Sequence, residues 1–304
     1  MANETVLFFI HALTPLHVGA GRGVRFIDLP VIREKITGWP IVPGSAIKGV
    51  LADYYHATDA QRETNDKLRS AFGIADKGTV DGGMPNAGSL VFTDAHLICL
   101  PVRSLYGTFA WITSSMALKR FMRDLESAGK ADGLSVPENP SEDILLIPSD
   151  TDSLLCREDR VFLEDYDFGY QEDDSTKNLA EKMANFLYGD ASEWKQEFIK
   201  RFAVVPNEAF DFFSEMGTEV RARIRIEEQT KTVKEGALWY EEYLPAESVL
   251  AGLIWCDRIY GSSTLSATDL TGEYCQGELH LQMGGNATIG KGQVRMLFHQ
   301  GGES

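Results

Sequence analysis

Apolar residues along this chain form two kinds of pattern, and both predict strands. Nearly continuous apolar runs at 6–10, 90–99 and 248–260 predict strands that are buried on at least one face of a sheet. Alternating apolar and polar positions at 277–283 and 293–299 predict two further strands. The chain is therefore expected to begin and end in strands.

Helical patterns lie between these strands. The predicted helices share an apolar stripe at a spacing of three to four residues, and they cover 44–55, 115–127, 176–188, 192–202 and 207–216. Residues 59–72 predict a polar helix or a loop. The apolar stripes are most simply explained as helix faces that pack on the sheet.

A strand, a following helix and further strands near the C-terminus suit a ferredoxin-like core of the βαββαβ type, as in RNA-recognition modules. The predicted fold class is therefore α+β. No segment has the composition of a long inter-domain linker, so residues 1–304 are expected to form a single domain. Residues 129–216 begin with a proline-containing stretch of little periodicity and are expected to form an inserted helical subdomain.

The segment between the first strand and the first helix, the 16–43 excursion, combines His17 with glycines, arginines and one isolated carboxylate. Glycines leave backbone N–H groups accessible, and arginines add positive charge. These residues are Gly19, Gly21, Gly23, Arg22 and Arg25. The carboxylate, Asp28, stands between apolar residues shortly before Pro30, and the proline favours an extended loop.

Gly44 and Ser45 open the first predicted helix, and Lys48 lies one turn further on, off the apolar stripe. N–H groups at a helix start, a serine and a lysine can together hold a phosphate. With the 16–43 excursion, this pattern favours a site for a nucleic-acid backbone with one carboxylate beside it. The alternative is structural: the glycines and prolines only make turns, and Asp28 only caps one.

Residues 219–245 predict a long hairpin with a basic face. Arg221, Arg223 and Arg225 alternate with apolar residues, so a strand places the three arginines on one side. Exposed apolar residues are expected near the far end. The hairpin is either a solvated edge whose charges guard against aggregation or a protruding thumb that contacts RNA phosphates and wedges between bases.

A glycine-rich loop connects the last two predicted strands. From Gly285 to Lys291 it matches a Walker A motif, but Gly292 stands where a Ser or Thr should bind magnesium. A strand pattern follows, whereas a nucleotide P-loop opens a helix. We therefore exclude a nucleoside triphosphatase and expect Gly285, Gly290, Lys291 and Gly292 to let an RNA backbone approach closely.

Composition narrows the class of protein. The chain of 304 residues has a formal net charge of −16. Such acidity argues against indiscriminate long-range attraction of nucleic acid, but it allows a local basic groove. Ten acids against two arginines between Asp150 and Asp174 predict a surface that faces away from RNA or toward a basic partner.

The four cysteines form no C-x-x-C pair, so reduced thiols are expected and a zinc site is not. No apolar run has the length of a membrane span, and the first residues lack the pattern of a signal peptide. We therefore expect a cytoplasmic protein without a membrane partner.

Three separated motifs in a fixed order carry a family resemblance. IVPGSAIKG (41–49) after HVGAGRG (17–23) resembles the RAMP superfamily of CRISPR proteins. TDAHLICLPVRSLYGTFAWITS (93–114) narrows the resemblance to the backbone subunit of the type III-B (Cmr) effector complex. GGNATIGKGQV (284–294) is similar to the glycine-rich loop of the same superfamily. The resemblance spans nearly the whole chain and is weakest at 128–202.

The resemblance implies a subunit that binds CRISPR guide RNA, stacks head to tail with copies of itself and contacts other Cmr subunits. It also implies a thumb hairpin and cleavage of complementary target RNA at regular intervals by a loop aspartate, with a divalent metal, Mg or Mn. Asp28 matches that aspartate, and Asp28 is then the expected metal ligand. His17 and Glu227 are candidate assistants.

Two other functions remain open at this point. A purely structural RNA-binding scaffold shares every basic and glycine-rich feature but needs no role for Asp28. A metabolic enzyme that binds a phosphate with one glycine loop leaves the basic hairpin unexplained. Because the sequence offers no second carboxylate at a short fixed spacing from Asp28, a preformed two-metal site is not expected.

Overall fold

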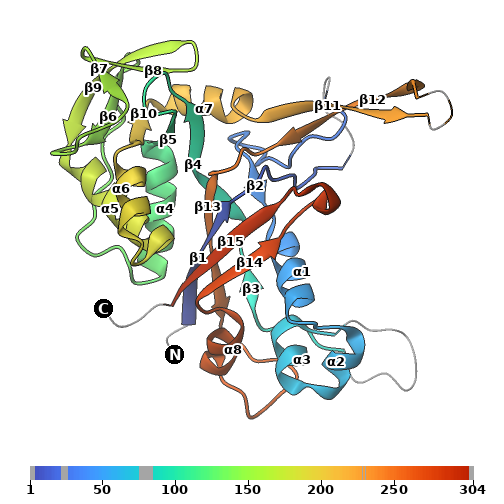
Figure 1. Ribbon diagram of the computed structural model, residues 1–304. Coiled ribbons are helices and arrows are strands. Elements are labelled where there is room, and N and C mark those ends of the chain that lie inside the picture. The colour runs from blue at the N-terminus through green and yellow to red at the C-terminus, as the bar shows by residue number, and fades with distance from the viewer. Residues whose placement is uncertain (1–3, 22–26, 75–84, 228, 230, 301–304) are drawn as a thin grey trace.

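A computed structural model describes residues 4–300 apart from 22–26, 75–84, 228 and 230. The central strand is β1 (Glu4–Ala12), which pairs antiparallel with β13 (Val249–Cys256) on one side and with β15 (Gln293–Gln300) on the other. The two ends of the chain therefore lie side by side in one sheet (Figure 1).

The core has the predicted ferredoxin-like arrangement. Its strand order is β15-β1-β13-β4, where β4 (Ala95–Arg103) is antiparallel to β13. Helix α1 (Gly44–Tyr54) lies between β1 and β4 along the chain, and α8 (Ala267–Tyr274) lies between β13 and β15. This is the βαββαβ connectivity with four antiparallel strands, so the predicted fold class is confirmed.

Short elements complete this core. They are β2 (Ile41–Val42), α2 (Asp59–Thr64), α3 (Asp66–Phe72), β3 (Val91–Phe92) and β14 (Glu278–Gln282). The predicted strand at 90–99 is divided between β3 and β4 at Thr93 and Asp94. Asp94 accepts a hydrogen bond from the Gly44 N–H at 2.8 Å, so this break fixes the start of α1.

The chain between β4 and β13 forms an insertion that continues the main sheet in the order β4-β5-β10-β6-β9-β8-β7. Its strands are β5 (Phe109–Ser114), β6 (Ile144–Pro148), β7 (Cys156–Arg157), β8 (Arg160–Leu163), β9 (Tyr166–Asp173) and β10 (Phe202–Val205). Its helices are α4 (Ser115–Ser127), α5 (Asp174–Tyr188), α6 (Ser192–Ile199) and α7 (Asn207–Met216).

The insertion differs from the expected helical subdomain at 129–216. The predicted helices are present, but β6 to β10 were not predicted, and the insertion already begins with β5 (Figure 1). β7 and β8 are short, β9 contains several charged residues, and all three lie in the acidic segment, so they carry no apolar pattern long enough to stand out from a loop.

Strand β1 has apolar side chains on both faces because helices cover both faces of the sheet. Val6, Phe8 and Ile10 belong to a core that includes residues of α1 and α8. Leu7 and Phe9 belong to a second core with residues of α4, α5 and α6. Successive side chains of a strand point to opposite faces, so a doubly covered strand must be a continuous apolar run.

The predicted thumb is a hairpin of β11 (Glu219–Ile226) and β12 (Val233–Tyr243). It forms a two-stranded sheet that is separate from the main sheet and projects from the body (Figure 1). The glycine-rich loop lies between β14 and β15, with a short 3-10 turn, η1 (Ala287–Ile289). A strand follows that loop, as predicted, so it does not have the geometry of a nucleotide P-loop.

Cys99, Cys156, Cys256 and Cys275 are free thiols, as expected. Within the part of the chain that the structure describes, no helix has the length and apolar character to traverse a lipid bilayer.

Gly44→Ala is expected to lower the free energy of unfolding by about 1–3 kcal/mol, because a Cβ would lie 2.3 Å from the Phe92 carbonyl oxygen. Gly49→Ala in the same helix is the control, since its Cβ meets nothing within 4 Å. That control should stabilise the chain by about 0.5–1 kcal/mol through helix propensity. Urea unfolding measures both; equal effects of the two substitutions would contradict the tight approach at Gly44.

Candidate nucleic-acid interface

Asp28 lies on the edge of β12, where the 16–43 excursion crosses the root of the hairpin. The Tyr240 N–H donates to Asp28 Oδ2 at 2.8 Å. The N–H groups of Asp28 and Leu29 both donate to the Tyr240 carbonyl oxygen at 3.1 Å. The Asp28 side chain is exposed. Its backbone and one carboxylate oxygen are therefore fixed, while the carboxylate faces solvent.

His17 joins three segments that are far apart in the sequence. Its Nδ1–H donates to the Glu242 carbonyl oxygen at 2.7 Å, and its ring packs edge-on against Tyr243. Its own carbonyl oxygen accepts a hydrogen bond from the Gly285 N–H at 2.9 Å. His17 is buried. The ring thus connects the 16–43 excursion, the hairpin root and the glycine-rich loop.

Glu241 directly follows Tyr240, the residue of β12 that binds Asp28. It was not identified as a candidate from the sequence. Leu29 forms a bridge with Glu241. The buried Glu241 carboxylate accepts hydrogen bonds from Trp239 Nε1 at 2.8 Å, from the Tyr243 hydroxyl and from Asn286 Nδ2 at 3.1 Å. Burial opposes its ionisation, but the Tyr243 and Trp239 hydrogen bonds and the charge of Arg223 outweigh burial and lower the pKa of Glu241.

Tyr243 is the hydrogen-bond donor at the centre of this cluster. Burial, together with its hydrogen bond to Glu241, raises the pKa of Tyr243 to about 12, so the hydroxyl stays protonated at neutral pH. Asn286 Nδ2 donates to the same hydroxyl at 2.9 Å. The Lys291 ammonium lies 5.3 Å from the ring centroid of Tyr243, and the Arg221 guanidinium lies 6.0 Å from it. Two of the predicted RNA-binding cations therefore gather at the hairpin root.

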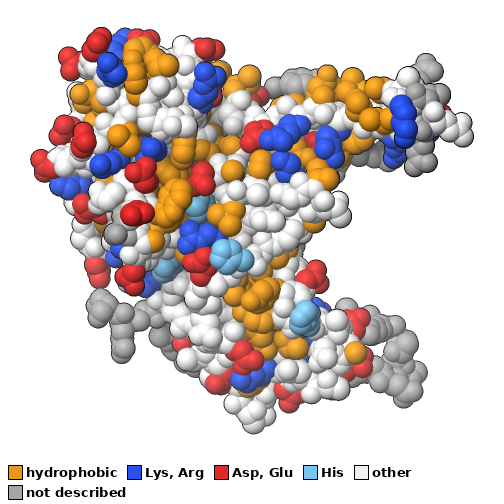
Figure 2. Space-filling view, viewed as in Figure 1, with side chains coloured by type: hydrophobic (Ala, Val, Ile, Leu, Met, Phe, Trp, Pro, Cys, Tyr) orange, Lys and Arg blue, Asp and Glu red, His pale blue; other side chains and the backbone are white. Residues whose placement is uncertain are grey.

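The hairpin has a basic face, as predicted. Arg221 lies opposite Glu241 in the ladder and Arg223 opposite Trp239, so both arginines share a face with those residues. Arg221 pairs with Glu219, and Arg223 Nε lies 3.5 Å from Glu241. Arg225 makes no ion pair with any residue that the structure describes. Figure 2 shows Lys and Arg side chains along the underside of the hairpin near its root.

The opposite face of the hairpin is apolar and open. Large hydrophobic side chains that are at least one-third exposed lie along it: Val220, Ile224, Ile226, Leu238 and Tyr240. Figure 2 shows hydrophobic side chains along the upper side of the hairpin. A row of exposed apolar side chains of this kind is typical of a contact site on a folded protein.

Glu227 does not join Asp28. Asp28 binds Tyr240, which pairs with Ala222, and Glu227 follows Ala222 by five strand positions. At 3.3 Å per residue, Glu227 lies roughly 17 Å further along the hairpin. The backbone of Glu227 instead bonds Thr232 and Lys231 at the far turn. Carboxylates that do lie at the hairpin root with Asp28 are those of Glu241 and Glu242.

Several of the predicted RNA-binding glycines make contacts within the chain, so their backbone is not open to a ligand. The N–H groups of Gly44, Gly285 and Gly292 donate to Asp94, His17 and Pro15, respectively. A Cβ on Gly284 would lie 2.1 Å from the His17 carbonyl oxygen, and one on Gly292 would lie 1.9 Å from that of Met283. The glycine-rich loop therefore packs closely on the root of the 16–43 excursion. The loop was expected to let an RNA backbone approach closely, but what approaches it closely is another part of this chain. The amides of Gly44, Gly285 and Gly292 already donate to acceptors in this chain.

The other predicted RNA contacts lie in the 16–43 excursion, at the start of α1 and in the glycine-rich loop. Gly19 and Gly21 donate to no acceptor among the described residues, and a Cβ on Gly21 or on Gly290 would meet nothing within 4 Å. Ser45 is exposed at the start of α1. Arg22 and Arg25 lie outside the described residues.

Lys48 is half-buried beside Gly88. A Cβ on Gly88 would lie 2.9 Å from the Lys48 Nζ. Burial, with the nearby charge of Arg62, lowers the pKa of Lys48. No described residue forms an ion pair with Lys48. Among the residues that the structure describes, the ammonium therefore has no counter-charge.

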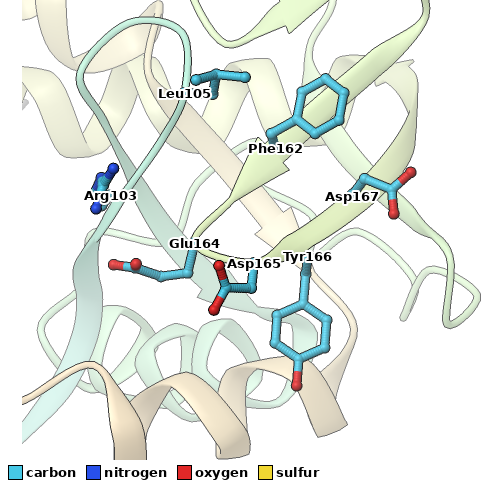
Figure 3. A pocket seen from close by; sticks show the side chains of 7 residues that line it. All are labelled: Arg103, Leu105, Phe162, Glu164, Asp165, Tyr166 and Asp167. Atoms are coloured by element: carbon cyan, nitrogen blue, oxygen red, sulfur yellow. The ribbon is translucent and has the colours of Figure 1, made fainter.

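The candidate site is an open root of a hairpin and not a closed pocket. A cavity of about 280 Å³ lies elsewhere, in the insertion. Figure 3 shows it between the end of β4 and the β8–β9 turn, lined by Arg103, Leu105, Phe162, Glu164, Asp165, Tyr166 and Asp167. None of the predicted site residues lines it. This form suits an extended chain ligand better than a small molecule.

The carboxylates at the hairpin root permit at most a sparse metal site. One oxygen of Asp28 accepts the Tyr240 N–H, and both oxygens of Glu241 accept hydrogen bonds. The described residues contain no cluster of three or more acid, His or Cys side chains suited to a metal ion. Mg²⁺ often binds through one or two carboxylates, waters and substrate phosphate oxygens. Asp28 fits a site of that kind.

The chain belongs to the RAMP superfamily, whose family model matches residues 9–295. It is 35% identical over 98% of its length to the CRISPR system Cmr endoribonuclease Cmr4 of Pyrococcus furiosus, covering 96% of that protein. It is 27% identical to the CRISPR system CMR subunit Cmr4 of Saccharolobus solfataricus, over 96% of this chain and 95% of that protein.

Solved structures agree with this assignment. The crystal structure of oligomeric Cmr4 from Pyrococcus furiosus superposes with a TM-score of 0.71 at 27% identity, over 98% of this chain and 99% of that one. A chain of the type III-B Cmr-beta complex bound to cognate target RNA shares the fold, with a TM-score of 0.69 at 20% identity over 97% of this chain and 96% of that one.

Tyr243→Phe is expected to lower the free energy of unfolding by about 1–3 kcal/mol at neutral pH, because Glu241 loses a donor to its charged form. The folded pKa of Glu241 lies below its usual 4.5, so ionised Glu241 stabilises the fold above that pH and stops doing so as the pH falls through the folded pKa. The cost of Tyr243→Phe should therefore shrink on acidification.

Urea unfolding at neutral pH and at about pH 3 measures this difference. Tyr240→Phe on the same strand is the control, because the Tyr240 ring is exposed. A cost that stays constant between the two pH values would mean that Tyr243 does not stabilise the charged form of Glu241.

Proposed function

We propose that this chain is the backbone subunit of a type III-B CRISPR effector complex, where it binds guide RNA and cuts complementary target RNA. The position of Asp28 supports this most directly: an exposed carboxylate is held by the backbone at the root of a projecting hairpin with a basic face and an apolar face. The 35% identical relative is named as an endoribonuclease of the Cmr system.

The grip on RNA would be independent of sequence. Arg221, Arg223, Arg225 and Lys291 offer positive charge to phosphates at the hairpin, and Lys48 offers it at α1. The exposed apolar face gives bases a surface on which to stack or part. Base identity would then be read by pairing between guide and target, not by the protein.

Asp28 would act on the ribose of the target strand. It accepts the proton of the 2′-OH as that oxygen attacks the adjacent phosphorus in line, and the bond from phosphorus to the 5′-oxygen breaks. The leaving oxygen takes a proton from water, and the products are a 2′,3′-cyclic phosphate and a 5′-hydroxyl. Because RNA supplies the nucleophile, one exposed carboxylate suffices, and DNA is not a substrate.

A divalent cation, Mg²⁺ or Mn²⁺, would be held by Asp28 together with phosphate oxygens of the RNA. Such an ion would neutralise charge that develops on the phosphate. Glu241, whose two oxygens are both engaged, would keep Tyr243 and Asn286 in place instead of binding metal.

Assembly would follow the guide RNA. Copies of this chain would stack head to tail along it, together with other Cmr subunits, in the cytoplasm. A relative was crystallised as an oligomer. A contact between two different surfaces of the same chain extends into a filament when its rotation does not close.

Asp28→Ala in the assembled complex is expected to slow cleavage of a complementary RNA by at least about 100-fold, because the transition state loses its base. The control is Glu227→Ala, an acid far along the same hairpin, which should cleave at the wild-type rate. A target with a 2′-deoxyribose at the cut site should resist cleavage. EDTA should stop the reaction, and added Mg²⁺ or Mn²⁺ should restore it.

Wild-type cleavage by Asp28→Ala, with unchanged binding of guide and target, would instead support the purely structural scaffold. Cleavage that persists in EDTA would remove the metal from the proposal and leave the role of Asp28 intact.

Arg225→Gln in the full chain is expected to weaken binding of single-stranded guide RNA uniformly across sequences. It should also reduce the slope of log affinity against log salt by about 0.7, the value for one phosphate contact on a single strand. Lys177→Gln in the insertion, which removes a cation paired with Asp150, is the matched control. Filter binding over a salt series measures both slopes; equal slopes for Arg225→Gln and the wild type would exclude a phosphate contact.

A further inference from the structure

Two neighbouring carboxylates on β12 face opposite sides of the hairpin. Glu241 lies in the cluster with Tyr243, whereas Glu242 lies opposite Val220, on the other face. The Glu242 side chain is buried, with 2% of its surface exposed. A buried carboxylate requires partners for its charge, so its donors show what it holds together.

Three donors from two segments converge on this carboxylate. The Val31 N–H donates to Oε2 at 2.9 Å, and Arg33 Nη2 donates to Oε1 at 2.5 Å. The Thr218 hydroxyl donates to Oε1 at 2.8 Å. Val31 and Arg33 belong to the 16–43 excursion, and Thr218 precedes β11. One side chain therefore joins the excursion to both strands of the hairpin.

The backbone around Glu242 continues the same contact. The Glu242 N–H donates to the Leu29 carbonyl oxygen at 3.0 Å, next to the bonds between Asp28 and Tyr240. Arg33 also donates to the Ser214 carbonyl oxygen of α7 at 2.9 Å. The excursion is thus held to β12 from Asp28 to Arg33, and the ion pair of Arg33 with Glu242 belongs to that contact.

We propose that Glu242, with Arg33, is a positioning residue for cleavage: it holds the excursion against β12 so that Asp28 stays aligned with the RNA at the hairpin root. This inference rests on the proposed ribonuclease function. Glu242 is buried and its carboxylate is bonded to Val31, Arg33 and Thr218, so it would act through these contacts and not on the RNA itself. Loss of its charge leaves Arg33 without its partner, and a displacement of about 1 Å in a catalytic group can cost roughly 100-fold in rate.

The same excursion contains a matched ion pair that does not reach the hairpin. Arg120 of α4 binds Glu34 with two hydrogen bonds, at 2.6 and 2.7 Å. Arg120 is 20% exposed and Arg33 is 22% exposed, whereas Glu34 is 24% exposed and Glu242 only 3%. Glu34→Gln therefore disturbs the fold of the excursion without releasing it from β12, which makes it the control for Glu242→Gln.

The test uses the complex assembled with guide RNA. Single-turnover cleavage at saturating target, the Kd for target and stability to urea are measured for Glu242→Gln and Glu34→Gln. Both variants should be less stable. Only Glu242→Gln should cleave more slowly, by about 10- to 100-fold, with a target Kd within about twofold of the wild type.

The pair with Arg33 gives an independent check. The double variant Arg33→Met with Glu242→Gln should cleave no more slowly than the slower single variant, because both changes break one interaction. Arg33→Lys should recover part of the rate that Arg33→Met loses. If Glu242→Gln does not assemble, Thr218→Val removes a single donor with little change in shape and should slow cleavage by about two- to tenfold.

Wild-type cleavage by Glu242→Gln would overturn the inference, and so would an equal loss in Glu34→Gln. A loss that appears only in the target Kd would also overturn it. Failure of the proposed function is a separate result, since it would appear as normal cleavage by Asp28→Ala.

Discussion

The antiparallel pairing of β1 with both β13 and β15 determines where the 16–43 excursion, the hairpin and the glycine-rich loop come together. His11 lies opposite Val249 at the start of β13, and Ala12 lies opposite Val294 at the start of β15. The end of one strand and the beginnings of two others therefore lie at one edge of the sheet. The 16–43 excursion leaves from that edge, and the hairpin and the glycine-rich loop return to it. Residues near positions 17, 243 and 286 meet there because the pairing of these strands brings their connecting segments to the same edge.

The palm, which is the ferredoxin-like core of β1, α1, β4, β13, α8 and β15, was predictable, and so was the hairpin, because their patterns are long and have one physical cause. A strand covered on both faces must be apolar throughout, as 6–10 is, and alternating arginines at 221–225 reveal a strand with two unlike faces. The strands of the insertion were not predictable in the same way. β6 is short and ends in Pro148, and β8 contributes only a few buried residues within an acidic segment. Their burial comes from the neighbours they pair with in the sheet, which a local pattern does not contain.

The site was predicted in part. Asp28, His17 and the basic face of the hairpin do gather at its root, but Glu227 lies far along the strand and Glu241 takes the place expected for it. Glu227 and Glu241 are both glutamates of the same hairpin. Which of them lies at the root becomes clear only from the pairing of β11 with β12. The glycines show a similar limit. Gly284 and Gly292 must be glycine because carbonyl oxygens of this chain leave no space for a Cβ. A loop rich in glycine is equally typical of a ligand site, so the sequence alone did not distinguish the two.

The hairpin forms its own small sheet, and the chain enters it from α7 and leaves it for β13, two elements that do not depend on its length. The entropy cost of a longer connection grows only slowly with the number of residues. Evolution can therefore lengthen, shorten or redecorate the tip without disturbing the palm, while the carboxylates at its root keep their setting. In a lineage of related chains, the reach of the hairpin and the chemistry at its base are free to change at different rates.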